Sequence, residues 1–448
     1  MPPHVHARAR AIAALSVAAA AVGLAACSDS STDILTHSGA TAEVTGVGTL
    51  VTDQAATPHP VIAHVGDVEV YGGGYGSAVA PAPGRSGYFY LLTDRGPNFA
   101  LNGSIAFAIP DFTPQIGLFR RTNGTLARTK VIELKDENGQ PLSGRPIPAG
   151  AGSTGETPVD VNGNTLPFDP KGVDSEGLVA LGDGTFWISD EYGPFLIHFD
   201  AEGRTLARFG PFGGAGSLPV VLAKRRVNRG MEGLTILPDG VTLVGAMQSP
   251  LDGNPARPSS SAPTFNRLLF YNTVTGATKQ VLYPIERGDR LISEIVALTS
   301  TTLLVLERDG NFPGSAAGVV KRVYKIDVTN ATDVNTANPL TDADGYNLLT
   351  GPGAGKTIEG ATAAEVAASE VVPVSKSLVL DIVASDPDFP HDKAEGLAVL
   401  DAHTIVVTND DDFGVTDAGS GLLQKILPLT GQADENHLYV FRVDEALF

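Results

Sequence analysis

Four glutamates recur at the start of strand-like runs, and they are the residues in this sequence best suited to chemistry. Three of them stand in the tripeptide Glu-Gly-Leu, and the four are Glu176, Glu232, Glu294 and Glu395. Carboxylates that converge from separate segments repel one another unless a cation lies between them, and Ca²⁺ accepts many oxygen ligands in loose geometry. The glutamates therefore predict a site for Ca²⁺ or another divalent cation. The alternative is that Glu-Gly-Leu is only a strand-entry signature that binds neighbouring backbone amides.

Two further acids and two arginines occupy repeated positions beside these glutamates. Asp190 and Glu191 end the second run of the lead copy, and Arg95 and Arg308 stand in other copies where Glu191 stands in this one. A guanidinium offers a forked donor to phosphate oxygens, and a metal polarises phosphorus and acidifies water. We expect Asp190 and Glu191 to complete the site or to orient the attacking water, and the arginines to bind phosphate. Alternatively, the cations only form salt bridges with nearby acids.

The repeat that carries these residues predicts an all-β fold. Within Gly172 to Asp200, two short apolar runs flank the turn Gly182-Asp183-Gly184, which is typical of a β-hairpin. Folding this hairpin brings the acids at its two outer ends together. A third and usually a fourth strand-like run follow each copy. Repeats of several strands that cannot bury their apolar faces alone indicate a β-propeller with four-stranded blades.

Five blades can be counted in the sequence, and a sixth is possible. The weakest copy has Tyr75 where the others have the acid, and the last copy has only three strands before Phe448. The run Glu43 to Val51 is predicted to supply the missing strand and so to close the propeller. The insertion Thr329 to Lys376 is long enough for a sixth blade, although its Gly, Ala, Asp and Thr content favours a surface loop.

The N-terminus predicts export. Residues 1–26 combine two arginines with a short apolar run that ends Leu24-Ala25-Ala26-Cys27, which resembles the lipobox of bacterial lipoproteins. We expect residues 1–26 to be a lipoprotein signal peptide, Cys27 to be lipidated, residues 27–43 to be a flexible tether and residues 44–448 to be the propeller domain. The protein would then lie outside the cytoplasm, at the cell envelope, and contact the membrane through its lipid anchor only. The alternative is an ordinary secreted protein.

The net charge of -19 argues against nucleic acid as a partner, because such binding needs a basic face. A divalent cation and a small phosphorylated substrate are the expected ligands. We expect the protein to be a monomer.

Five segments together resemble the phytase-like family, which is named for an esterase-like activity of phytase. They are DPKGVDSEGLVALGDGTFWISDEYGP (Asp169 to Pro194), TDRGPN, PQIGLF, NRGMEGL and KAEGL. The resemblance covers roughly Val44 to Phe448, and it implies an exported propeller with phosphoesterase activity. A more distant similarity to calcium-dependent propeller phosphatases agrees with the glutamates, although Tyr75 departs from a uniform ring of acids.

The sequence therefore predicts a metal-dependent phosphoester hydrolase, phytase-like or phosphodiesterase-like. Two alternatives fit the same residues. A metal-dependent lactonase or carboxylesterase would use the same mouth of the propeller without phosphate. A non-catalytic propeller would bind a partner at the cell envelope.

Overall fold

The computed structural model describes the backbone of residues 42–51 and residues 60–122, 124–213, 217–251, 264–287, 289–315, 318–337, 341–342, 345–417 and 421–448. The chain divides into two units, residues 1–36 and 37–448, and the description covers only the second. The predicted signal peptide, Cys27 and nearly all of the predicted tether lie outside the described residues. No helix among the described residues is long and apolar enough to cross a membrane.

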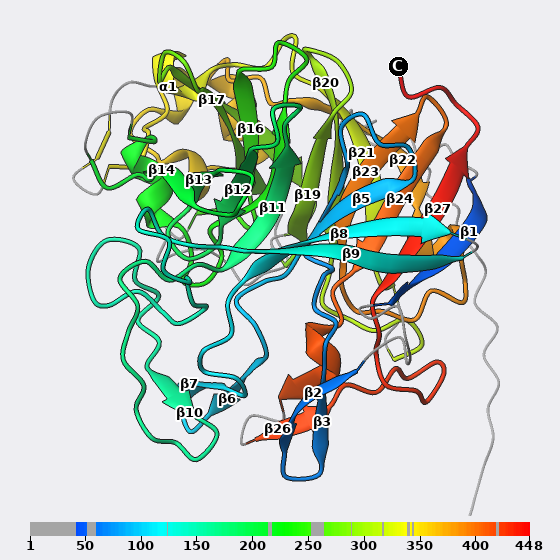
Figure 1. The fold of residues 1–448 in the computed structure, drawn as a ribbon. Coiled ribbons are helices and arrows are strands. Elements are labelled where there is room, and N and C mark those ends of the chain that lie inside the picture. Colours follow the sequence, from blue (N-terminus) through cyan, green and yellow to red (C-terminus); the bar gives the residue numbers. More distant parts are fainter. Residues whose placement is uncertain are drawn as a thin grey trace, which may run out of the picture. The chain divides into compact units, whose positions relative to one another are not determined.

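Three separate antiparallel sheets each contain four strands that follow one another in the chain (Figure 1). The first holds β11 (Ser175–Ala180), β12 (Phe186–Asp190), β13 (Phe195–Phe199) and β14 (Thr205–Phe209). The second holds β15 (Met231–Ile236), β16 (Thr242–Met247), β17 (Thr264–Asn272) and β18 (Thr278–Ile285). The third holds β19 (Leu291–Ala297), β20 (Thr302–Arg308), β21 (Lys321–Asp327) and β22 (Ser375–Asp381).

Two further groups of four strands are joined edge to edge into one eight-stranded sheet. One group holds β4 (Ala78–Pro81), β5 (Tyr88–Leu92), β8 (Gln115–Thr122) and β9 (Thr125–Glu133). The other holds β23 (Ala394–Asp401), β24 (Thr404–Asn409), β27 (His437–Val443) and β1 (Ala42–Val51). β1 pairs antiparallel with β27 and, over Thr49–Val51, parallel with β9. The predicted N-terminal strand thus completes the last group.

Successive groups pack face to face. The first strands contact one another in the order β4, β11, β15, β19 and β23, and β23 also contacts β4. An apolar cluster fills each of the five spaces between neighbouring groups; in one of them Leu268 of β17 lies with Leu303 of β20. Strands covered on both faces are apolar throughout, as Phe186–Ile188 of β12 are. This nearly all-β arrangement is consistent with a β-propeller-like fold, and the number of blades stays a prediction.

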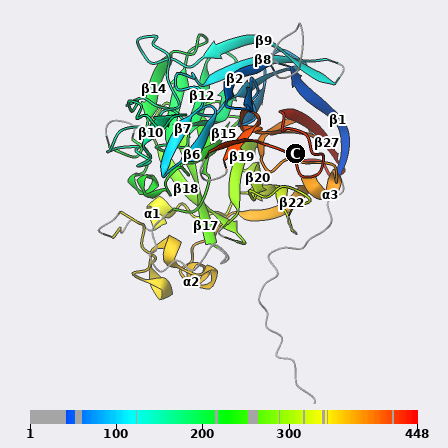
Figure 2. The same ribbon diagram turned by 90° about the horizontal axis from the view of Figure 1, so that it is seen from below.

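The insertion after β21 forms helices and loops. It contains α1 (Val334–Ala337), η2 (Gly351–Gly353), η3 (Ile358–Gly360) and α2 (Ala363–Ala368), and it lies on the outer side of β17 and β18 (Figure 2). Arg267 of β17 forms a buried ion pair with Glu359, with Nη2 and Oε1 2.6 Å apart. In its described part, residues 329–337, 341–342 and 345–374, no further sheet forms.

Short additional strands lie together below the five groups in Figure 1. They form the sheet of β6 (Asn98–Leu101), β7 (Ser104–Phe107) and β10 (Pro158–Asp160), and the hairpins β2 (Val61–Val65) with β3 (Val68–Tyr71) and β25 (Val415–Asp417) with β26 (Leu422–Gln424). β25 contacts both β6 and β3. Of these strands, β6, β7 and β25 contribute residues to one wall of the candidate site.

Candidate functional site

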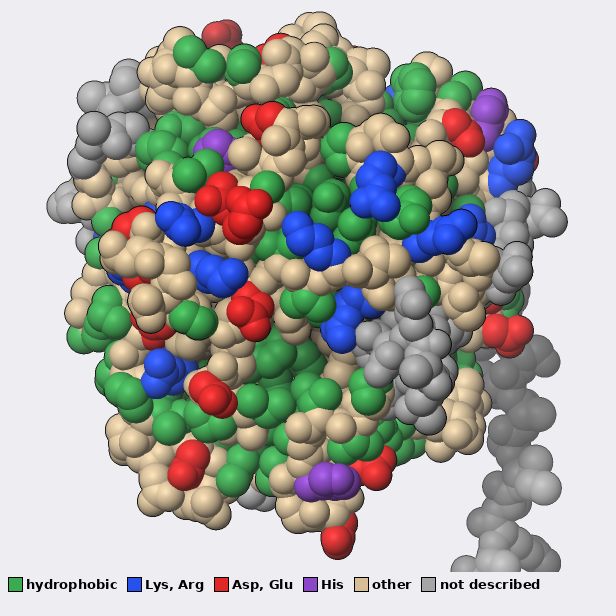
Figure 3. Space-filling view, viewed as in Figure 1, with side chains coloured by type: hydrophobic (Ala, Val, Ile, Leu, Met, Phe, Trp, Pro, Cys, Tyr) green, Lys and Arg blue, Asp and Glu red, His purple; other side chains and the backbone are tan. Residues whose placement is uncertain are grey.

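A pocket of about 480 Å³ opens where the first strands begin. Its charged lining comes from the starts of first strands, from the ends of second strands and from the loops beside the additional strands. We call it the acid pocket, and its charged residues are Asp94, Arg95, Glu156, Asp174, Glu176, Glu191, Arg229, Glu232, Arg308, Lys393, Glu395, Asp410, Asp412 and Asp417. On the outer face shown in Figure 3, by contrast, acidic and basic side chains are interspersed.

The acid pocket brings together six of the eight side chains that the sequence singled out for metal, water or phosphate. They are Glu176, Glu232, Glu395, Glu191, Arg95 and Arg308. Glu294 and Asp190 do not line it.

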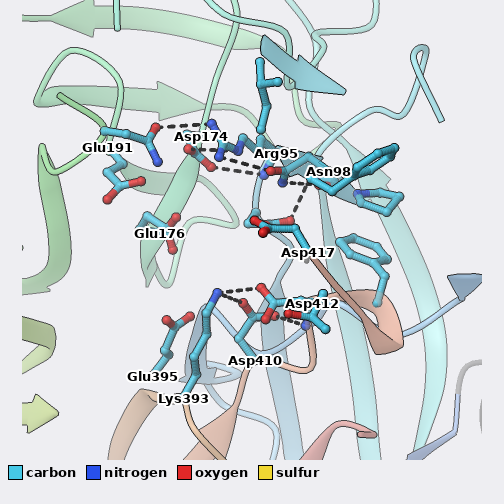
Figure 4. Close-up of a pocket in the computed structure, with 18 of the residues that line it drawn as sticks. Arg95, Asn98, Asp174, Glu176, Glu191, Lys393, Glu395, Asp410, Asp412 and Asp417 are labelled. Atoms are coloured by element: carbon cyan, nitrogen blue, oxygen red, sulfur yellow. Dashed lines mark hydrogen bonds and ion pairs between the residues drawn. The ribbon is translucent and has the colours of Figure 1, made fainter. Parts of the chain in front are cut away.

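Asp174, Glu176 and Glu191 form a compact trio of carboxylates, which we call the Glu176 trio. Each contributes one oxygen, and these oxygens lie within 4.8 Å of one another. Glu176 is 8% exposed, and its carboxylate receives no hydrogen bond or ion pair from the residues that the structure describes (Figure 4). Burial, and then the charge of Glu232, raise its pKa well above the ordinary value. A buried carboxylate without a partner is stabilised by a cation, so this trio could hold a metal ion.

Glu232 lies beside the trio and is held by an amide. Gln248 Nε2 donates a hydrogen bond of 2.9 Å to Glu232 Oε2. Burial, and then the charge of Glu395, raise the pKa of Glu232 to about 8. The glutamate can therefore carry a proton near neutral pH, which is a property of groups that transfer protons.

In a second acidic trio, Asp94, Asp410 and Asp412, two of the three carboxylates are already paired with lysines. Lys393 Nζ lies 2.9 Å from Asp410 Oδ2 and 2.5 Å from Asp412 Oδ1 (Figure 4), and Lys425 Nζ lies 2.7 Å from Asp412 Oδ2. Two ammonium groups thus already bind Asp410 and Asp412. This trio does not fit a cation as the Glu176 trio does.

Both arginines predicted to bind phosphate lie in the acid pocket, and both are held by carboxylates. Arg95 Nη1 lies 3.3 Å from Glu156 Oε2, and its Nε lies 3.6 Å from Asp174 Oδ2. Arg308 forms a buried ion pair with Glu395. In the structure both arginines therefore form the salt bridges of the alternative interpretation.

Glu294 departs from the predicted ring because of strand register. In the lead copy Ser175 pairs with Asp190 and Leu178 with Ile188, whereas in β19 Ile292 pairs with Glu307 and Ile295 with Val305. The position of Glu176 therefore corresponds to Ser293, and Glu294 takes the position of Gly177.

The Glu294 carboxylate consequently binds backbone. Oε1 accepts the N–H groups of Leu234 at 2.8 Å and of Ile295 at 2.9 Å. Glu294 lines a smaller, mainly apolar cavity of about 160 Å³ between the first strands. Glu294 therefore has the alternative role, in which the carboxylate binds neighbouring backbone amides at the start of a strand, and not the predicted role of a metal ligand.

Asp190 supports the site from behind and does not face the pocket. Its Oδ2 accepts a 2.9 Å hydrogen bond from Arg208 Nη2, and its Oδ1 accepts the N–H groups of Tyr192 and Asp174. Burial raises its pKa to about 6, although the charge of Arg208 opposes the shift. The predicted role in orienting water does not fit this position, since both oxygens are used to hold the loop that carries Asp174.

Several pocket residues escaped the sequence-based prediction because they lie outside the repeat or do not recur as acids within it. Asp174 precedes Glu176 by two residues, and that short acidic spacing was the one available signal. Asn98 begins β6 and Glu156 lies in the loop before β10, and both contact Arg95. Gln248 holds the repeat position of Glu191, but an amide there gives no charge pattern to follow.

A family model described as phytase-like, esterase-like activity of phytase, matches residues 72–413. The chain belongs to the phytase-like family. The matched region of this phytase-like chain contains the Glu176 trio, Glu232 and all four cationic side chains of the acid pocket. β1 and β27, which pair with each other, lie outside it.

Among curated proteins, the chain is similar to an uncharacterized secreted protein of Arthroderma benhamiae, with 32% identity over 193 residues. That alignment covers 34% of this chain and 37% of the relative. Among solved structures, the chain aligns with a putative oxidoreductase (glucose dehydrogenase) of Thermus thermophilus at 12% identity and a TM-score of 0.36, over 90% of this chain and all of that one. It also aligns with Kuenenia stuttgartiensis hydrazine synthase at 11% identity and a TM-score of 0.28, over 75% of this chain and 64% of that one.

Proposed function

We propose that this phytase-like chain is a metal-dependent phosphoester hydrolase that acts outside the cytoplasm. The observation that carries the proposal is the Glu176 trio, in which a buried carboxylate without a partner faces a pocket that also contains guanidinium groups. The family description, esterase-like activity of phytase, supports ester hydrolysis as the reaction. The metal is Ca²⁺ or another divalent cation, because all three donors are carboxylates.

Eight side chains of the acid pocket then have defined roles. Asp174, Glu176 and Glu191 hold the cation, which when bound supplies positive charge that polarises a phosphate ester and acidifies water. Glu232, whose pKa is raised to about 8 by burial and by Glu395, accepts or returns a proton at its carboxylate. Gln248 fixes the orientation of Glu232. Arg95 holds Asp174 in place, and the Arg308–Glu395 pair fixes the opposite wall.

The scaffold and location complete the proposal. The five groups of four strands are the blades of one propeller, since their first strands contact in a continuous order and an apolar cluster fills every interface. The chain is exported, as the similar fungal protein is described as secreted, and Cys27 is its lipid-attachment site. The protein works as a monomer.

The test is a comparison of two isosteric variants by calorimetry and turnover. Glu176→Gln should abolish Ca²⁺ binding and metal-dependent hydrolysis while leaving the fold intact. Glu294→Gln is the matched control, because its amide oxygen can still accept the two backbone N–H groups outside the pocket. Elemental analysis of the purified protein and assays with and without chelator identify the metal. Unchanged Ca²⁺ binding in Glu176→Gln would remove the metal role of the trio.

A metal-dependent lactonase or carboxylesterase is the second candidate. It is favoured by one observation, which is that Arg95 and Arg308 are ion-paired with carboxylates in the protein itself. A carboxylic ester or lactone needs no cationic side chain for recognition. Turnover of lactones with no turnover of any phosphate ester would select this candidate over the first.

A further inference from the structure

Arg229 differs from the other cationic side chains of the acid pocket. Arg95, Arg308 and Lys393 are each ion-paired with a carboxylate, at Asp174, Glu395 and Asp410 respectively. The Arg229 side chain also lines the pocket, but it makes no hydrogen bond or ion pair to the residues described. It is therefore the pocket guanidinium whose donors remain available to a ligand.

The backbone fixes Arg229 next to the Glu176 trio. Asn228 has a φ of 50°, and Arg226 and Arg229 form a β-bridge, so a tight turn precedes β15. Gly230 packs so closely on the backbone of Glu191 that a Cβ there would lie 2.1 Å from the Glu191 carbonyl oxygen. Arg229 is thus held beside Glu191, with Glu232 three residues further along the chain.

The charge of the acid pocket limits how many negative charges a ligand can carry. Ten carboxylates and four cationic side chains line it among the described residues. Three of these cations are already paired, so one divalent cation and Arg229 are left to offset an anionic ligand. A ligand with several phosphates would place most of them against carboxylates, which is unfavourable.

We propose that Arg229 is the substrate-binding residue for the phosphoryl group and that the substrate is a phosphate diester. A diester carries one negative charge over two free oxygens, which matches the forked donors of a guanidinium. This inference rests on the proposed function and selects the phosphodiesterase form of it over the hydrolysis of polyphosphorylated esters.

The reaction adds water across one ester bond. The water oxygen forms a bond to phosphorus, the bond from phosphorus to the leaving oxygen breaks, and one proton of the water ends on that oxygen. The products are an alcohol and a phosphate monoester. Because the monoester carries more negative charge than the diester, the carboxylates of the pocket favour its release over a second hydrolysis.

The experiment measures kcat and KM of the full chain with Ca²⁺ on bis(p-nitrophenyl) phosphate, p-nitrophenyl phosphate and myo-inositol hexakisphosphate. The diester should have the highest kcat/KM. Arg229→Ala should lower kcat/KM for the diester by about tenfold or more, mostly through KM, and Arg229→Lys should restore part of it. Arg226→Ala is the matched control, because Arg226 shares the turn but does not line the pocket.

The outcomes separate the two proposals. A preference for hexakisphosphate or the monoester, or equal kinetics of Arg229→Ala and Arg226→Ala, would overturn the diester inference and leave the hydrolase standing. If no phosphate ester were turned over although Ca²⁺ binds, both would fall. Calorimetry should show that Arg229→Ala binds Ca²⁺ as the unmodified protein does, because Arg229 is not part of the trio.

Discussion

Arg308 and Glu395 form a buried ion pair in one wall of the acid pocket, with side-chain exposures of 6% and 5%. Sequence position suggested a phosphate ligand for the arginine and a metal ligand for the glutamate, but each is the other's partner. Arg308 Nε also donates a 2.9 Å hydrogen bond to Ser293 Oγ, the residue that replaces a glutamate in this strand register. The pair links β20 to β23 and shapes the wall opposite the Glu176 trio.

Breaking this pair from one side should be costly. Arg308→Ala leaves the Glu395 carboxylate buried without its partner, so we expect the free energy of unfolding to fall by about 3–5 kcal/mol. The double variant Arg308→Met with Glu395→Met should lose much less, because no charge stays buried. Urea unfolding of the single and double variants measures the difference. An equal loss of unfolding free energy in the single and double variants would mean that the unpaired Glu395 charge is not the cause of the loss.

Glu232 should make the metal-free protein less stable as the pH rises. Its pKa is raised in the folded state to about 8 by burial and by Glu395, so its contribution to stability is complete below the unfolded pKa near 4.5 and is lost as the pH rises through about 8. The loss amounts to about 1.4 kcal/mol for each unit by which folding raises the pKa.

Melting curves in chelator at pH 5 and pH 8 test this effect. Glu232→Gln cannot ionise, so its Tm should fall less than that of the unmodified protein between the two pH values. Glu202→Gln, in an exposed turn, is the control and should behave like the unmodified protein. A Tm difference between pH 5 and 8 that is the same in all three proteins would contradict the prediction.

The glycine of Glu-Gly-Leu should be intolerant of a side chain. A Cβ at Gly177 would lie 2.5 Å from the backbone nitrogen of Leu234 and 2.7 Å from the carbonyl oxygen of Glu232, both in the next first strand. Gly177→Ala should therefore destabilise the fold by about 1–3 kcal/mol or more, since backbone cannot move aside easily. Gly182→Ala is the control, because nothing lies within 4 Å of the Cβ it would gain. Thermal unfolding that ranks the two variants equally would refute the close approach.

Removal of Arg267, which binds the insertion through Glu359, should make the insertion more mobile without loss of activity. Arg267 is 1% exposed and also donates a 2.8 Å hydrogen bond to Asn347, so Arg267→Ala leaves Glu359 buried and unpaired. We expect faster hydrogen exchange over residues 345–370 and unchanged turnover, because no described insertion residue lines the acid pocket. Lys356→Ala, which removes an exposed ion pair with Glu365, should change neither.

The four-stranded repeat was predictable because it rests on local patterns. Apolar runs on either side of Gly182-Asp183-Gly184 specify the β11–β12 hairpin, and Gly184 indeed has a φ of 90°. The pairing of the run at Glu43 with the last group followed from a missing fourth strand, and β1 confirms it.

The candidate site was predictable only in part, since it depends on register and on segments outside the repeat. An alignment by charge matched Glu294 with Glu176, although Ser293 is the structural equivalent of Glu176. The mismatch arose because the Ser293-Glu294-Ile295 segment lacks the glycine that marks the other copies. Asp174 and Glu156 reach the pocket through loops with no repeated pattern. Whether an arginine is free or paired, as for Arg229 and Arg308, is set by neighbours from other groups and cannot be read from spacing.

The pairing of β1 with β27 also determines when the domain can be finished during synthesis. β1 emerges from the ribosome before the other described strands and β27 after them, so β1 stays without this partner until the other strands of the domain have been made. An open strand edge is a template for pairing with other molecules. A nascent or truncated chain that lacks β27 would therefore expose the edge of β1 that pairs with β27, and aggregation would compete with completion of the last group of strands.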